Sequence, residues 1–103
     1  MRLRFTSVEI LVCTYLARYG RDSFDELLIQ NVLGRKAKSA LQKSRNIAWM
    51  LKEKGYGHHK SISPLSGASR GAPSRWTDWD SVSKYIVFSK DEHLRHCKTI
   101  LEC

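Results

Sequence analysis

The chain has 103 residues, of which 42% are hydrophobic, and its formal net charge is +8 at pH 7. This length suffices for one domain with a modest core, and the hydrophobic fraction excludes a wholly disordered chain. No apolar run approaches the ~20 residues that a membrane-spanning helix needs, and three cysteines without a framework spacing favour a reducing compartment. We therefore expect a cytoplasmic protein that does not contact a membrane.

The first expected helix covers residues 7–19. It opens on a capping box, in which Thr6 and Glu9 satisfy the first free backbone amides. Apolar residues then recur at helical spacing and give one buried stripe. Gly20 suits the left-handed conformation that ends a helix.

A second expected helix begins after a cap at Asp22 or Ser23, with Asp25 in its first turn, and ends at Gly34. Only about two residues then precede the next helical pattern, and such a short connection containing glycine makes two helices cross steeply. With the first helix bracing this pair, residues 1–55 are predicted to form a three-helix helix-turn-helix core in a mainly α fold.

The third expected helix, residues 35–54, has two different faces. One carries an apolar stripe at i, i+3, i+4, i+7 spacing, formed by Ala37, Ala40, Leu41, Ile47, Ala48 and Leu51. The opposite face combines polar and cationic groups with an aromatic side chain expected to be exposed: Lys38, Ser39, Gln42, Asn46 and Trp49.

Nearly all of the net charge lies on this third helix and the residues just after it. Residues 34–60 hold eight basic residues and one acidic residue, whereas residues 1–33 have zero net charge and residues 61–103 have +1. A basic element between neutral flanks indicates a surface for a polyanion. The alternative is that Lys and Arg, as good helix formers, only solvate an exposed face.

These features predict a nucleic-acid-binding helix. Lys and Arg neutralise phosphates, and amide and hydroxyl groups contact base edges. The expected base-facing residues are Lys38, Ser39, Gln42 and Asn46, with Trp49 beside them. The expected phosphate-binding residues are Arg35, Lys36, Lys43 and Arg45, with Lys60 from the following loop.

Residues 56–75, rich in Gly, Ser and Pro, are predicted to be a flexible loop or the wing of a winged helix. Either Arg70 and Arg75 add phosphate contacts from it, or it is an inert surface loop. Residues 76–103 then form a C-terminal helical segment packed on the same domain. Thr77 or Asp78 is its expected cap, and the pattern leaves open whether residues 76–88 are a helix or a short wing strand.

The two tryptophans of this segment are either core anchors or stacking platforms for nucleotides. Ser89 and Glu92 form a second capping box, which predicts a last helix ending at about Leu101. Its apolar edge docks either on the domain or on a second copy of the chain, so the sequence leaves a homodimer open.

No pattern predicts an enzyme, a cofactor site or a metal site. The acidic residues are scattered among helix starts, and the glycines form no phosphate-binding motif. His93, His96 and Cys97 share one side of the last helix, but their spacing matches no closed zinc site.

Leu33-Gly34-Arg35 followed by Ser39, Lys43 and Asn46-Ile47 resembles the helix-turn-helix (homeodomain-like or winged-helix) DNA-binding domains of bacterial and phage proteins. These include modules that precede certain HNH-type endonucleases. The resemblance covers only about 20 residues and implies DNA binding through a helix-turn-helix. It does not imply the nuclease, because no HNH constellation follows.

The sequence therefore predicts a small protein that binds double-stranded DNA, of the kind found among transcriptional or phage regulatory factors, with residues 35–54 in the major groove. Two other partners stay open. One is RNA. The other is an acidic protein surface, as for a phage-encoded inhibitor of a host nucleic-acid-processing or defence complex, and an exposed Trp49 would favour it.

Overall fold

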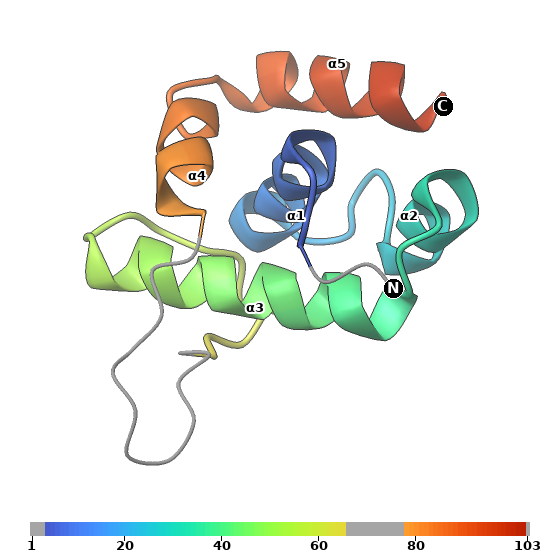
Figure 1. Ribbon diagram of the computed structural model, residues 1–103. Helices are drawn as coiled ribbons and strands as arrows, with labels where there is room; N and C mark the ends of the chain where they lie inside the picture. Colours follow the sequence, from blue (N-terminus) through green and yellow to red (C-terminus); the bar gives the residue numbers. More distant parts are fainter. Residues whose placement is uncertain (1–3, 66–77, 103) are drawn as a thin grey trace.

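A computed structural model describes residues 4–65 and 78–102, and these residues form five helices and no strand (Figure 1). The mainly α fold is thus confirmed. In Figure 1, α1 lies between α3 below and α5 above, with α2 and α4 on either side. The helices are α1 (Ser7–Tyr19), α2 (Glu26–Leu33), α3 (Ala37–Glu53), α4 (Trp79–Tyr85) and α5 (Lys90–Leu101).

The central helix α1 is buried on all sides rather than along one stripe. All nine residues from Glu9 to Ala17 are buried, and only its ends reach the surface. The reason is that α1 packs against each of the other four helices, and a helix in that position must present apolar or fully bonded side chains all round. Local periodicity had predicted only one buried face.

Small side chains let α1 and α3 approach closely. The Cys13 thiol lies 3.6 Å from the backbone oxygen of Ala40, and the neighbouring Ser44 hydroxyl donates to the same oxygen at 2.9 Å. Burial raises the pKa of the Cys13 thiol to about 12, so the thiol stays protonated and serves as a packing group.

Most helix ends lie where the capping residues predicted them. Both capping boxes form, at the starts of α1 and α5, and Gly34 ends α2 in the left-handed region. The start of α2 differs: Asp25 is its cap and accepts hydrogen bonds from two backbone amides. The predicted cap at Asp22 or Ser23 is wrong, because the Asp22 carboxylate accepts from the Tyr15 hydroxyl and pairs with Lys90.

The segment that the sequence left undecided is helical over Trp79–Tyr85. Asp78 precedes α4 in the left-handed region and makes no side-chain cap. Trp79 packs against the core as an anchor. Of the flexible loop or wing expected over residues 56–75, residues 66–75, with Arg70 and Arg75, lie outside the described residues, as does the expected cap at Thr77.

Residues 55–65, here called the return segment, run back along α3. The backbone amide of His59 donates to the oxygen of Ala17 at 2.8 Å, and Ile62 is fully buried. Leu65 reaches α3 again, where its amide donates to the oxygen of Arg45. This segment is therefore bonded to both α1 and α3.

His93 fixes α5 to α1. Its Nε2–H donates to the backbone oxygen of Leu11 at 2.8 Å, so Nδ1 is left as the acceptor for an N–H of Arg18 at 3.1 Å. Burial lowers the pKa of His93 to about 4, and the Arg18 charge adds to the effect. The ring is therefore neutral at pH 7.

The return segment requires glycine at position 20. Gly20 has φ 77 and ψ −155, a region that essentially only glycine occupies, and an added Cβ would meet three His59 ring atoms within 2.9 Å. Gly20→Ala is expected to lower the free energy of unfolding by about 3 kcal/mol, measured by urea denaturation.

Two glycines of the return segment provide controls. Gly55 has φ 85 but open space around it, so Gly55→Ala should cost about 1 kcal/mol from backbone strain alone. Gly57 has neither constraint, so Gly57→Ala should stay within about 0.5 kcal/mol of the wild type. Equal effects at all three positions would contradict the described contact between Gly20 and His59.

His93 makes stability depend on pH. Its pKa is about 4 in the folded protein and 6.5 in the unfolded chain, so the unfolded chain binds the proton first as the pH falls. Stability should drop by about 3 kcal/mol between pH 6.5 and pH 4. In His93→Gln the amide keeps both hydrogen bonds without titrating, so its unfolding free energy should fall less over this range. Parallel curves for the two proteins would contradict the assignment.

Candidate nucleic-acid interface

The corner between α2 and α3 is fixed mainly by Gln30. Its backbone oxygen accepts from the amide of Gly34 at 2.9 Å, and its side-chain oxygen accepts from the amide of Ala37 at 2.8 Å. One residue of α2 thus satisfies the end of its own helix and the start of α3. The connection contains three residues, 34–36, and α3 begins at Ala37.

The outward side of α3 is polar and basic. Lys38 and Gln42 are exposed, and Arg45 is partly exposed one turn further on. Lys52 continues this line at i+14 from Lys38, as helical spacing requires. We define the outer stripe of α3 as Lys38, Gln42, Arg45 and Lys52. Lys36, just before the helix, is exposed, and Ser39 is partly exposed beside the stripe.

Arg35 is not on this surface, so its predicted role at a phosphate is corrected. Its side chain is 6% exposed, and its guanidinium donates to both carboxylate oxygens of Glu9, at 2.8 and 3.3 Å. It also donates to the backbone oxygen of Arg4 and stacks on the Phe5 ring at 3.9 Å. Arg35 therefore joins the start of α3 to the start of α1.

Lys43 is likewise committed within the protein. Its ammonium lies 2.8 Å from the carboxylate of Asp78, and its side chain is 8% exposed. The predicted phosphate contact is corrected, because Lys43 holds the residue before α4 against α3. Its substitution would remove an ion pair that is buried on the lysine side, so weaker binding by such a variant would not indicate a phosphate contact.

Asn46 is also buried, which corrects its predicted position facing base edges. Its side-chain amide donates to the backbone oxygen of Leu65 at 3.3 Å, while Nε of Arg45 donates to the oxygen of Ser63 at 3.1 Å. The return segment thus covers one flank of the middle of α3. Arg45 stays partly exposed at the edge of that contact.

Two further predicted residues differ in exposure. Trp49 packs against the core and is only partly exposed, so the aromatic side chain expected on the surface is only partly accessible. Lys60 is exposed on the return segment. The binding residues predicted from the sequence did not include Lys52 and Lys54, both exposed at the end of α3. Lys52 could have been identified from its i+14 spacing to Lys38, which puts the two on the same side of the helix.

The histidines and cysteines do not gather into a metal site in the described part of the chain. His93 is bonded to α1, and Cys97 is buried about one turn before the end of α5. Across residues 4–65 and 78–102, no helix is both long and apolar enough to cross a membrane.

Comparison with protein-family models, with curated proteins and with solved structures finds no match to this chain.

The buried pair of Glu9 and Arg35 should contribute far more to stability than a surface pair. Arg35→Met leaves the Glu9 carboxylate buried without its partner, so we expect the free energy of unfolding to fall by about 3–5 kcal/mol. Arg21 pairs with Glu26 at 3.0 Å but is 33% exposed, so Arg21→Met should cost less than about 1 kcal/mol. Urea denaturation of both variants measures the contrast, and similar losses would contradict it.

Proposed function

We propose that this chain is a small DNA-binding protein of the helix-turn-helix kind that places the N-terminal half of α3 in the major groove. The observation that carries the proposal is the outer stripe of α3, in which cations flank the exposed amide of Gln42. A side-chain amide can hydrogen-bond to base edges in the major groove, and the cations on either side of it can contact the phosphates that border the groove. Lys36 and Ser39 extend this surface toward the start of α3.

The corner between α2 and α3 supports this pose. Because Gln30 bonds the start of α3, the first turn of α3 is held in place before any ligand binds. Base contacts in helix-turn-helix proteins come mainly from the N-terminal residues of the second helix of the motif, while the first crosses the DNA backbone. Lys38 and Gln42 occupy that part of α3.

The charge distribution also supports a polyanionic partner. Five lysines on α3, beside its two ends and on the return segment are exposed: Lys36, Lys38, Lys52, Lys54 and Lys60. Glu53 is the one acidic residue among positions 34–60. Two acidic residues outside these positions pair within the protein: Asp22 with Lys90, and Glu26 with Arg21. Most of the net positive charge therefore lies on and next to α3.

A protein partner is less well supported, because Trp49, the feature that favoured it, is only partly exposed and packs against the core. A-form RNA has a major groove too deep and narrow for a helix, so duplex RNA serves as the discriminating ligand.

The proposal is tested by fluorescence anisotropy with random-sequence duplex DNA and duplex RNA over a salt series. Binding through several phosphates gives a log–log slope of about −4 or steeper for DNA. DNA affinity should exceed RNA affinity. Absence of binding to duplex DNA at low salt, or tighter binding to RNA, would overturn the major-groove proposal.

Variants of the outer stripe separate phosphate contacts from base contacts. Lys38→Ala should weaken binding to every duplex alike and reduce the salt slope by about 1. Gln42→Ala should cost about 1–3 kcal/mol on the preferred site, obtained by selection, and little on random DNA. Lys98→Ala removes the same charge from the exposed side of α5 and should change neither quantity. Equal losses for Lys38→Ala and Lys98→Ala would argue against a binding face on α3.

A further inference from the structure

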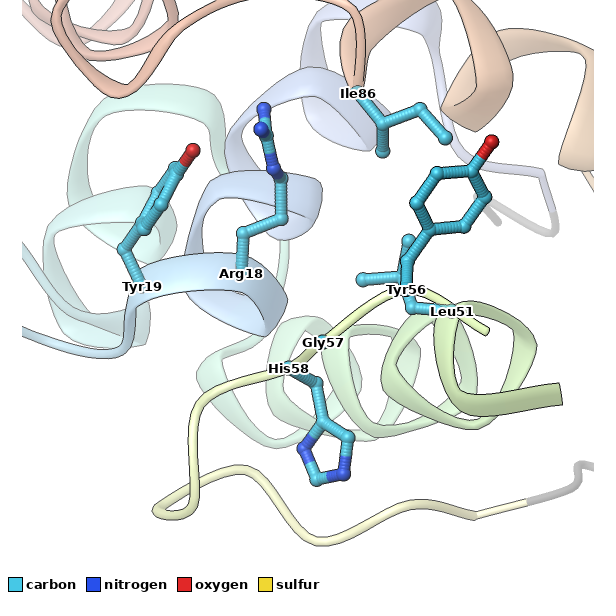
Figure 2. Close-up of a pocket in the computed structure, with 7 residues that line it drawn as sticks. All are labelled: Arg18, Tyr19, Leu51, Tyr56, Gly57, His58 and Ile86. Carbon is cyan, nitrogen blue, oxygen red and sulfur yellow. The ribbon is translucent and has the colours of Figure 1, made fainter. Parts of the chain in front are cut away.

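A cavity of about 320 Å³ lies between the C-terminal ends of α1, α3 and α4 and the beginning of the return segment. Figure 2 shows Arg18 and Tyr56 on opposite sides of it, Ile86 above and the backbone of Gly57 below. The ring of His58 points away from Arg18, so this residue offers its backbone to the cavity. None of the outer-stripe residues of α3 lines this cavity.

Arg18 brings a positive charge to the cavity that no carboxylate balances in the described part of the chain. Its guanidinium donates to the backbone oxygens of Tyr85 and Phe88 and to Nδ1 of His93, all of them neutral acceptors. These contacts use three of its five N–H groups. The ion pairs among the described residues do not include Arg18, so a half-buried cation lines the cavity with donors to spare.

Two successive backbone amides add further donors. The amide of Tyr56 bonds to Leu51, and the amide of His59 bonds to Ala17. Between them, the amides of Gly57 and His58 make no hydrogen bond within residues 4–65 and 78–102. Arg18, Gly57 and His58 line the same cavity, and free backbone amides and a guanidinium are both groups that bind an anion.

The remaining walls suit a flat apolar group. Tyr56 is 52% exposed, unusually so for a large aromatic side chain. The Trp79 ring packs near it, with the two ring centroids 6.5 Å apart. Leu51 and Ile86 supply aliphatic surface. The volume is at the small end of the ~300–1,000 Å³ range for ligand pockets, which fits a ligand of about the size of one nucleotide.

We propose that this cavity binds a planar aromatic ring bearing an anionic group, of the size of a single nucleotide. The ring stacks on Tyr56, and the anion accepts hydrogen bonds from Arg18 and from the amides of Gly57 and His58. Lys54, whose ammonium lies 5.8 Å from the Trp79 ring centroid, attracts the anion toward this side of the molecule. The source is either a free mononucleotide or the end of a single strand, and neither depends on duplex binding by α3.

The test is an NMR titration of the ¹⁵N-labelled protein with adenosine 5′-monophosphate (AMP), adenosine and inorganic phosphate separately. AMP should shift the amides of Gly57 and His58 and bind at least tenfold more tightly than adenosine or phosphate. No shift of these amides at millimolar AMP, or equal affinity for AMP and adenosine, would rule out a free nucleotide as the ligand.

A single-stranded pentathymidylate distinguishes the two sources. If AMP alone shifts the two amides, the ligand is a free nucleotide. If pentathymidylate shifts them, with or without AMP binding, the ligand is the end of a strand. If neither probe shifts them, the cavity is not a nucleotide site, whatever the result with duplex DNA.

A rim variant with a matched control tests the stacking contact without disturbing the core. Tyr56→Ala should weaken binding of the active probe roughly tenfold, the loss typical of one aromatic stacking contact on a base. Leu27→Ala truncates a side chain of similar exposure, 57%, on α2, which contributes nothing to the cavity, and should leave affinity unchanged. Equal affinities for Tyr56→Ala and Leu27→Ala would overturn the proposed stacking.

Discussion

The buried contact between Glu9 and Arg35 is the constraint on which the rest of the structure depends. The Glu9 carboxylate is fully buried, where an unpaired charge would cost several kcal/mol. This carboxylate accepts hydrogen bonds from the backbone amide of Thr6, the N-cap residue of α1, and from two nitrogens of the Arg35 guanidinium, Nε and Nη2. The pair therefore fixes the start of the central helix to the start of α3. Because Gln30 fixes the same end of α3 to α2, three helices meet in one defined geometry.

This geometry divides the basic residues on and just before α3 by role. Arg35 and Lys43 are bonded to Glu9 and Asp78 and hold the fold together, whereas Lys38 and its neighbours on the outer stripe face solvent. Net charge alone therefore overstates the cations available to a ligand. The proposed interface is smaller than the sequence suggested and lies toward the N-terminal half of α3, since the return segment covers one flank of its middle.

Capping residues and apolar periodicity predicted the helices well, because the residues that form a cap or one helix face are only a few positions apart in the sequence. They located both capping boxes and the glycine that ends α2. They failed where a partner is distant along the chain. Arg35 pairs across 26 residues and Asn46 bonds to Leu65 across 19, and no periodicity within one helix reports such contacts. Asp22 was misassigned as a cap for the same reason, since its partner Lys90 lies on α5.

The most direct test of the central claim, that the outer stripe of α3 is the binding face, is an NMR map of the amides perturbed by a duplex DNA oligonucleotide. The account predicts perturbations concentrated from Lys36 to Gln42, fading along α3 toward residues covered by the return segment, with α5 unaffected. Perturbations centred on α5, or spread evenly over the whole surface, would contradict it.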